Sequence, residues 1–218
     1  MKRNSDRCRQ DSERVLLVEG KNDCHVVMAL CGAYNVPELF TIYECGQDYK
    51  VLKRLNALIA KSDPPEVIGV MIDADNPSLA SRWDSIRDKL NQHQKHGYSL
   101  PESPDPNGTI LESTSDGPNI GFWLMPNNKD SGMLEDFCAS LAEPASLAFA
   151  KECVDKASEQ KQTTYQETHY SKAIIHTYLA WQDTPGAPLG LAITKQALRP
   201  DTATAKMFKD WLVRLFDR

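Results

Sequence analysis

The chain has 218 residues, of which 41% are hydrophobic, and its formal net charge is −5. This length suits one α/β domain, or one domain with a helical appendage, at roughly 100–200 residues per domain. The mildly acidic balance argues against a protein that coats DNA through its whole surface. Any contact with nucleic acid would need a local basic patch or bridging cations.

The cysteines are scattered without a CxxC pair, at Cys8, Cys24, Cys31, Cys45, Cys138 and Cys153. Their spacing fits neither a zinc knuckle nor a small secreted disulfide framework, which predicts reduced and mostly buried thiols. The basic N-terminal stretch lacks the apolar core of a signal peptide, and no segment approaches the roughly 18 apolar residues of a membrane helix. We therefore expect a soluble, cytoplasmic protein without membrane contact.

The first part of the chain predicts strands that alternate with helices. Apolar runs at 15–18 and 39–43 are typical of strands buried on both faces. Apolar residues at helical spacing follow each run, over 26–31 and 48–60. Strands and helices that alternate in this way imply right-handed crossovers and a parallel sheet.

The stretch EVIGVMIDAD at 66–75 predicts the clearest strand, because it runs apolar after a proline pair and then stops on acids. A helix is predicted over 77–94, followed by a loop at 96–108 that is rich in proline and glycine. Two further strands are predicted at 109–113 and 119–126. The last of them pairs either in parallel or as an antiparallel edge.

Helical patterns dominate the rest of the chain, over roughly 133–141, 145–157, 171–181 and 205–216. We expect an α/β domain at 13–142 and a helical extension at 143–218 that packs on it.

Acidic residues stand where two of the predicted strands end, at Glu19, Asp73 and Asp75. In an open parallel sheet, ligands bind outside the carboxyl ends of the strands. Three carboxylates gathered there would repel one another unless a cation joined them. Oxygen ligands of this kind suit Mg²⁺, Mn²⁺ or Ca²⁺, and we expect Mg²⁺, with Mn²⁺ as the alternative. A lone DxD is usually a turn or a helix cap, but its placement together with Glu19 favours a metal site.

At these residues the stretches VLLVEGKNDCHV and VMIDAD resemble the glutamate and DxD motifs of the toprim domain. This domain is shared by topoisomerases, bacterial primases and nucleases of the overcoming-lysogenisation-defect type. The resemblance covers roughly residues 13–142 and implies a Rossmann-like, mainly parallel, four-stranded sheet flanked by helices. It also implies that Glu19 acts as general acid–base or metal ligand, and that Asp73 and Asp75 bind Mg²⁺.

More narrowly, the chain resembles an uncharacterised family of stand-alone toprim-like proteins. The resemblance lies in the two motifs above and in two further stretches, WLMPNNKDSGMLEDF (123–137) and HTYLAWQDTPGAPLGLAI (176–193). The chain has neither the active-site tyrosine domain of a topoisomerase nor the zinc module of a primase. It also lacks a GxxxxGK[ST] motif, so the ATPase half of the larger nucleases is either absent or supplied by a protein partner, which could also supply targeting.

The segment after the last predicted strand offers a further acid, Glu135. A loop broken at Gly132 would place Glu135 in the first turn of the next helix, near the same edge of the sheet. There it could hold a second metal ion. The alternative is that Glu135 and Asp136 are simply acids favoured by the helix dipole.

Three lysines are candidates for contact with a phosphate. Lys21 lies on the loop that follows Glu19, and Lys129 lies after the last predicted strand. Lys172 could neutralise charge that develops in a phosphoryl-transfer transition state, a catalytic role, although most lysines at helix starts are solvated. We interpret Asp23 as a helix cap rather than a ligand.

Histidines and tryptophans are not predicted to belong to the site. His25, His169 and His176 share no HxH or HxxxH spacing, so we expect solvated or packed side chains rather than zinc ligands. The side chains predicted to lie in the core are Trp123, Trp181 and Trp211.

Two functions remain open. The first is a Mg²⁺-dependent phosphoryl-transfer enzyme, most simply a nuclease acting on DNA or RNA. The second is a non-catalytic regulatory module that binds a nucleotide, a nucleic acid or a partner protein. A basic groove leading to the acids would favour the nuclease, whereas an exposed apolar patch elsewhere would favour the module.

Overall fold

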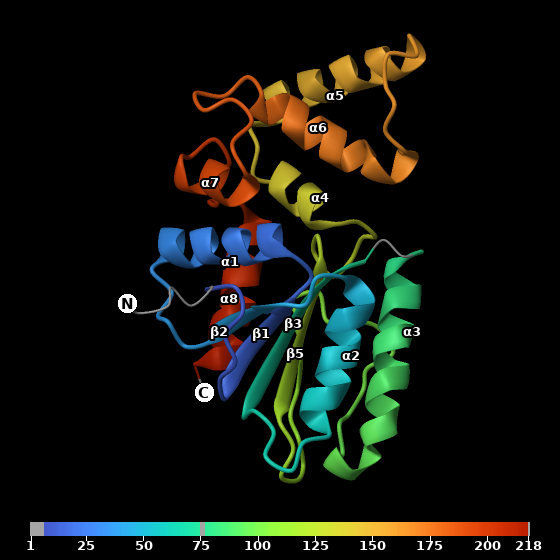
Figure 1. The fold of residues 1–218 in the computed structure, drawn as a ribbon, viewed down its shortest axis with the longest axis vertical. Helices are drawn as coiled ribbons and strands as arrows, with labels where there is room; N and C mark the ends of the chain where they lie inside the picture. Colours follow the sequence, from blue (N-terminus) through green and yellow to red (C-terminus); the bar gives the residue numbers. More distant parts are fainter. Residues whose placement is uncertain (1–6, 75–76, 218) are drawn as a thin grey trace, which may run out of the picture.

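A computed structural model describes residues 7–74 and 77–217 of the chain. In this described part, a five-stranded sheet has the strand order β2-β1-β3-β5-β4. Figure 1 shows the sheet between two layers of helices, with a further group of helices beyond one end of the strands. The strands are β1 (Arg14–Val18), β2 (Thr41–Glu44), β3 (Val67–Asp73), β4 (Thr109–Leu111) and β5 (Asn119–Met125).

The sheet is parallel except at one edge. β1 pairs in parallel with both β2 and β3, and β3 pairs in parallel with β5 along its whole length. β4 pairs antiparallel with β5. The resemblance implied four strands, and this count was wrong because the short strand β4 returns along β5 and adds an edge. The α/β class and the mainly parallel sheet are confirmed.

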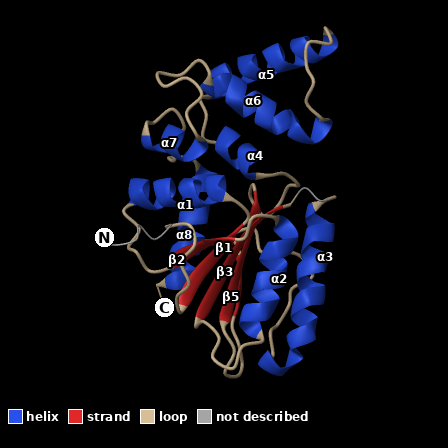
Figure 2. Ribbon diagram, viewed as in Figure 1, coloured by secondary structure: helices blue, strands red, loops and turns tan. Residues whose placement is uncertain are grey.

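Helices cover both faces of the sheet, and Figure 2 separates the two layers clearly from the strands. The helices α2 and α3 lie on one face, and α1 and α8 lie on the other. The helices are α1 (Lys21–Tyr34), α2 (Asp48–Ile59), α3 (Leu79–Leu90), α4 (Leu134–Ala139), α5 (Pro144–Glu159), α6 (Tyr170–Leu179), α7 (Leu189–Thr194) and α8 (Ala203–Phe216).

Each face of the sheet has its own hydrophobic core, because successive side chains of a strand point to opposite faces. In β1, Val15 and Leu17 pack with α2 and α3, whereas Leu16 and Val18 pack with α1 and α8. All four side chains are fully buried. This double burial explains why the strand reads as a continuous apolar run.

The helix α8 lies directly on the strands. A Cβ atom at Gly121 of β5 would come within 2.4 Å of Leu215 Cδ2, so only glycine allows this approach. Trp211 of α8 also packs against Trp123 of β5, with ring centroids 5.8 Å apart. The C-terminal helix therefore forms part of the same core as the sheet, and Trp123 and Trp211 are buried as predicted.

The helices α5 and α6 form a hairpin beyond the carboxyl ends of the strands (Figure 1). At this hairpin Trp181, two residues after the end of α6, is 48% exposed. Its ring centroid lies 5.6 Å from that of Phe149, which is 58% exposed. The prediction that Trp181 belongs to the core was wrong. Helical spacing placed it on an apolar face, but no other element covers that face in the part of the chain that the structure describes.

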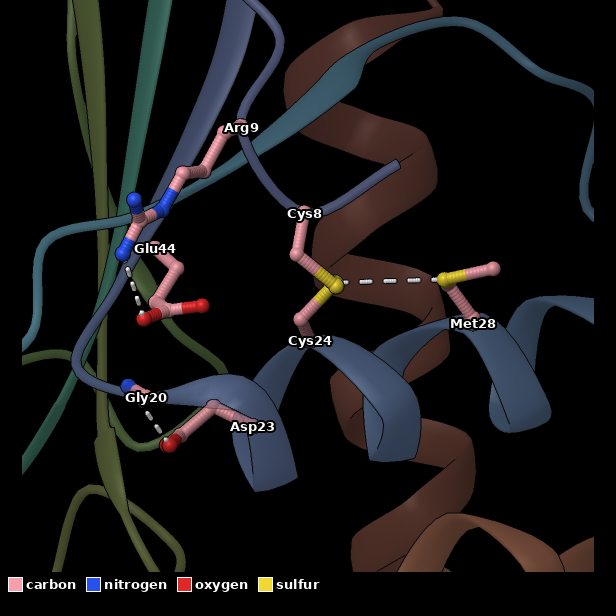
Figure 3. Close-up of a disulfide and its surroundings, with 7 residues drawn as sticks. All are labelled: Cys8, Arg9, Gly20, Asp23, Cys24, Met28 and Glu44. Atoms are coloured by element: carbon pink, nitrogen blue, oxygen red, sulfur yellow. Dashed lines mark hydrogen bonds and ion pairs between the residues drawn. A yellow bond between two sulfur atoms is a disulfide. The ribbon is translucent and has the colours of Figure 1, made fainter. Parts of the chain in front are cut away.

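The prediction that the cysteines are reduced was wrong for one pair. Cys8 and Cys24 form a disulfide with their Cα atoms 5.9 Å apart (Figure 3). The backbone of Cys8, Arg9 and Gln10, which we call the N-terminal segment, runs antiparallel beside β2. This long-range pairing brings Cys8 over the first turn of α1, where Cys24 lies. Cys31, Cys45, Cys138 and Cys153 are free thiols.

Across residues 7–74 and 77–217, no helix has both the length and the apolar character that crossing a membrane requires.

Candidate functional site

The structure brings Glu19 and Asp73 together at the carboxyl ends of two neighbouring strands. Glu19 directly follows β1, and Asp73 is the last residue of β3. The backbone N–H of Asp73 donates a hydrogen bond of 2.9 Å to Oε1 of Glu19. This contact fixes the Glu19 carboxylate beside the strand that carries the second acid.

A cleft of about 370 Å³ opens at this point. Among the described residues, its charged lining consists of Glu19, Asp23, Asp73, Glu135, Lys21 and Lys172. Four carboxylates thus face two ammonium groups, which gives the cleft an acidic character. Glu135 and the two lysines were predicted members of the site, whereas Asp23 had been interpreted as a helix cap.

The loop after β5 docks on the end of β3 and positions α4. The N–H of Ala74 donates to the carbonyl oxygen of Gly132 at 2.8 Å, and the N–H of Leu134 donates to Oδ1 of Asp73 at 2.9 Å. Gly132 has a φ of +159°, and a Cβ there would come within 2.7 Å of Oδ2 of Asp136. Glycine at this position therefore lets the loop turn back to the sheet, which places Glu135 at the cleft.

Asp23 has two roles in the structure. Its Oδ2 accepts a hydrogen bond of 3.0 Å from the N–H of Gly20, so it does cap the start of α1 (Figure 3). Its side chain is also buried in the wall of the cleft. Burial, followed by repulsion from Glu19 and then Glu135, raises the pKa of Asp23 from 3.8 to about 7. Burial, together with the neighbouring carboxylates, is thus enough to hold a proton on Asp23 near neutral pH.

Glu135 and Lys172 face each other across the cleft. Glu135 is 6% exposed, and its Oε1 lies 3.8 Å from Nζ of Lys172 in the first turn of α6. Asp136, by contrast, accepts a hydrogen bond of 2.9 Å from the N–H of Met133 and so caps the start of α4. The predicted alternative of a simple helix-terminal acid therefore fits Asp136, while Glu135 turns into the cleft.

Arg82 is a supporting residue that the sequence analysis missed. It is 6% exposed, and its Nε donates to the carbonyl oxygen of Asp73 at 2.9 Å. Its Nη2 forms an ion pair of 3.0 Å with Asp48 at the start of α2. Arg82 therefore ties α2 and α3 to the last residue of β3. The sequence did contain a signal for its burial. Arg82 stands four residues before the core residue Ile86, so both side chains lie on the same, buried face of α3.

One predicted residue lies away from the described cleft. Lys129 is exposed on the turn after β5, where its N–H donates to Oδ1 of Asn127 at 3.0 Å. Asp75 lies outside the described residues. The three histidines predicted to stay out of the site, His25, His169 and His176, are exposed.

The donors in the cleft suit a hard cation, because the lining offers carboxylate oxygens and neither sulfur nor imidazole. Within residues 7–74 and 77–217, no three His, Cys, Asp or Glu side chains converge closely enough to hold a metal ion. The fit to Mg²⁺ or Mn²⁺ thus rests on the type of donor atom, the carboxylate oxygens of the lining. Among these residues, Glu19 and Asp73 are the pair that the backbone already fixes in place.

Comparison with curated proteins and with solved structures finds no match. One family model, described as "Protein of unknown function (DUF3226)", matches residues 13–217, which includes every side chain of the cleft. The chain therefore belongs to the DUF3226 family.

Proposed function

We propose that this protein is a divalent-cation-dependent phosphodiester hydrolase, most simply a nuclease that acts on DNA or RNA. The observation that supports this proposal is the hydrogen bond that joins Glu19 to Asp73 at the mouth of a parallel sheet. Carboxylates gathered at this place, with Asp23 and Glu135 buried beside the partly buried Glu19 and Asp73, repel one another unless protons or a cation compensate their charge. The raised pKa of Asp23 indicates how unfavourable the uncompensated charge is.

In this proposal Glu19 and Asp73 hold Mg²⁺ or Mn²⁺, with Asp75 as the further ligand that the toprim resemblance implies and Glu135 as a ligand of a second ion. When bound, such ions neutralise phosphate charge and lower the pKa of water. Glu19 also serves as general acid–base toward the attacking water or the leaving oxygen. Lys172 stabilises the negative charge that develops on the phosphoryl oxygens.

The test is a cleavage assay on single- and double-stranded DNA and RNA, with Mg²⁺, with Mn²⁺ and with a chelator. The variants are Glu19→Gln and Asp73→Asn, because an amide oxygen can still accept the hydrogen bonds that these carboxylates accept. Glu152→Gln, an exposed residue of α5, is the matched control. We expect metal-dependent cleavage by the parent and the control, and a loss of at least 100-fold in the two site variants.

Cleavage that persists in both site variants would refute the proposed site. A parent that cleaves none of the four substrates with either metal would refute the nuclease and favour the second function.

The second function is a non-catalytic module that binds a partner protein, which could supply an ATPase or targeting function. The exposed aromatic pair of Phe149 and Trp181 favours it, because adjacent exposed rings are typical of interaction surfaces. The double variant Phe149→Ser with Trp181→Ser distinguishes the two functions. It would leave cleavage by a nuclease unchanged, but it would abolish co-purification of a partner from the source cell.

A further inference from the structure

A second cleft, of about 430 Å³, lies beside the edge strand β2 and has a basic lining. We call it the basic cleft, and its charged and aromatic lining consists of Arg9, Tyr43, Glu44, Lys50, Lys53 and Arg54. The whole protein carries a formal net charge of −5, so a concave surface with this excess of cations stands out from its surroundings.

The two arginines of the basic cleft are engaged within the protein. Arg9 forms an ion pair of 3.3 Å with the buried Glu44, as Figure 3 shows. Arg54 pairs with Asp11 and stacks over the ring of Tyr43, with its Cζ 3.4 Å from the ring centroid. These contacts neutralise Glu44 and build the wall of the cleft.

The two lysines are available to a ligand. Lys50 and Lys53 are exposed, and among the described residues neither forms an ion pair. Being three residues apart on α2, they lie on the same face of the helix, about 5–6 Å apart at their Cβ atoms. This arrangement can contact neighbouring phosphates of one strand.

An aromatic side chain stands beside these lysines. Tyr49 is 58% exposed, and Nζ of Lys50 lies 5.8 Å from the centroid of its ring. An exposed ring next to a positively charged groove is the combination by which proteins bind single-stranded nucleic acids. The groove follows the phosphates, and the ring stacks on a base.

The basic cleft adjoins the acidic cleft. Cys45 lines the basic cleft, and the next residue, Gly46, lines the acidic one. The N–H of Gly46 donates to the carbonyl oxygen of Glu19 at 2.6 Å, and a Cβ at Gly46 would lie 3.8 Å from Nζ of Lys50. A strand bound at Lys50 can therefore continue directly into the acidic cleft.

The helix that carries the lysines is also fixed relative to the acids. Asp48, two residues before Lys50, forms the ion pair with Arg82, which in turn donates to the carbonyl oxygen of Asp73. Arg82 thus ties the helix that carries the lysines to the acidic site.

We propose that the basic cleft binds the phosphate backbone of a single nucleic-acid strand, with Lys50 and Lys53 on consecutive phosphates and Tyr49 stacked on a base. This inference rests on the proposed function, because it directs the strand toward the acidic cleft. It names single-stranded nucleic acid as the substrate class.

The test measures binding apart from cleavage. Fluorescence anisotropy of a labelled 12-nucleotide single-stranded DNA is followed in a chelator over a series of salt concentrations, with the parent and with Lys50→Ala/Lys53→Ala. The matched control is Lys151→Ala/Lys156→Ala, which removes the same charge from exposed positions on α5. Tyr49→Ala probes the ring, and thermal melting verifies that each variant is folded.

We expect the double variant to bind at least tenfold more weakly, and its salt slope to fall by about 1.4, at about 0.7 per phosphate contact. Tyr49→Ala is expected to weaken binding about tenfold without a change of slope, since stacking carries no charge. The control is expected to change affinity less than twofold. A duplex of the same sequence is expected to bind more weakly than the single strand.

The inference is overturned if the parent does not bind, if the control loses as much affinity as the double variant, or if the duplex binds as tightly as the strand. Cleavage by the parent together with unchanged binding of Lys50→Ala/Lys53→Ala would overturn the inference and leave the proposed function standing. Weakened binding by that variant, with no cleavage by the parent, would support the inference and refute the catalytic function.

Discussion

The carboxylate of Glu19 accepts a hydrogen bond of 2.9 Å from the backbone N–H of Asp73, a residue 54 positions further along the chain. The contact joins two parallel strands just where their regular pairing ends. It gives Glu19 a structural role in addition to its proposed chemical one, and substitutions can separate the two.

Replacing Glu19 by alanine is expected to destabilise the protein by about 1–2 kcal/mol, because the partly buried N–H of Asp73 loses its acceptor. Glu19→Gln keeps an oxygen at the same place and is expected to cost less than about 0.5 kcal/mol. Urea denaturation in a chelator measures both free energies of unfolding. Equal losses in the two variants would show that the hydrogen bond does not stabilise the fold.

Arg82 is expected to be sensitive even to a conservative change. Its planar guanidinium serves Asp73 and Asp48 at once, whereas the ammonium of Arg82→Lys cannot reproduce this fork, so we expect a loss of about 2–3 kcal/mol. Arg87→Lys on the same helix is the control, since Arg87 is partly exposed and pairs with the exposed Asp84, so this change should alter stability by less than about 0.5 kcal/mol. Similar effects of the two substitutions would contradict the role assigned to Arg82.

The raised pKa of Asp23 predicts a dependence of stability on pH in the metal-free protein. The unfolded chain releases this proton near pH 4, but the folded chain keeps it until about pH 7. The folded state therefore binds more protons between these values, and its stability falls as the pH rises through this window, by on the order of 4 kcal/mol. Above about pH 7 this contribution is fully lost.

Unfolding measured in a chelator at pH 5, 6, 7 and 8 reveals this dependence, and Asp23→Asn should remove it because the amide does not titrate. The amide oxygen can still cap Gly20. A parent and a variant with parallel pH profiles would show that Asp23 is not the titrating group.

Two glycines should respond to alanine with opposite signs. Gly121→Ala places a Cβ within 2.4 Å of Leu215 and is expected to destabilise the protein by about 1–3 kcal/mol through overpacking. Gly32 of α1 has no atom within 4 Å of the added Cβ, so Gly32→Ala is expected to stabilise it by about 0.5–1 kcal/mol. Thermal and urea unfolding measure both effects. A neutral Gly121→Ala would mean that α8 does not lie on the sheet as described.

The disulfide predicts both a chemical and an energetic result. Alkylation in denaturant without a reductant should modify the four free cysteines, and all six should react after reduction. Because the linked residues are 16 positions apart, reduction should lower the free energy of unfolding by roughly 3 kcal/mol. Cys8→Ser should show no such response to the reductant. Six modified cysteines without a reductant would disprove the pairing.

Local patterns of the sequence predicted much of the fold. The strands that lead to Glu19 and Asp73 are buried on both faces, so their sequences are continuously apolar. This pattern predicted strands of a parallel sheet. Since parallel strands end at the same edge, the meeting of these two acids followed from the class of the sheet. The place of Glu135 followed from a second signal, because Gly132 before its helix marked where the loop turns back to this edge.

The features that the sequence did not reveal depend on contacts between distant elements. The pairing of Cys8 with Cys24 requires the N-terminal segment to lie along β2, which no local pattern encodes. Trp181 has the spacing of a core residue, but its burial depends on whether another helix covers it. Asp23 was predicted to be a helix cap, and it is one. Its place in the wall of the cleft was missed, because it depends on the direction in which α1 leaves the sheet.

The packing of α8 on the sheet has a consequence for the synthesis of the protein. The carbonyl oxygen of Phe216, at the end of α8, accepts a hydrogen bond from Arg14 at the start of β1, across 202 positions of the chain. At about 5–20 residues per second, a ribosome needs on the order of 10–40 s to make this stretch. During that time α8 is missing from one face of the nascent sheet, which only α1 and other earlier elements can cover. The sheet therefore completes its folding only after translation has passed α8, and chaperones have this interval in which to bind it.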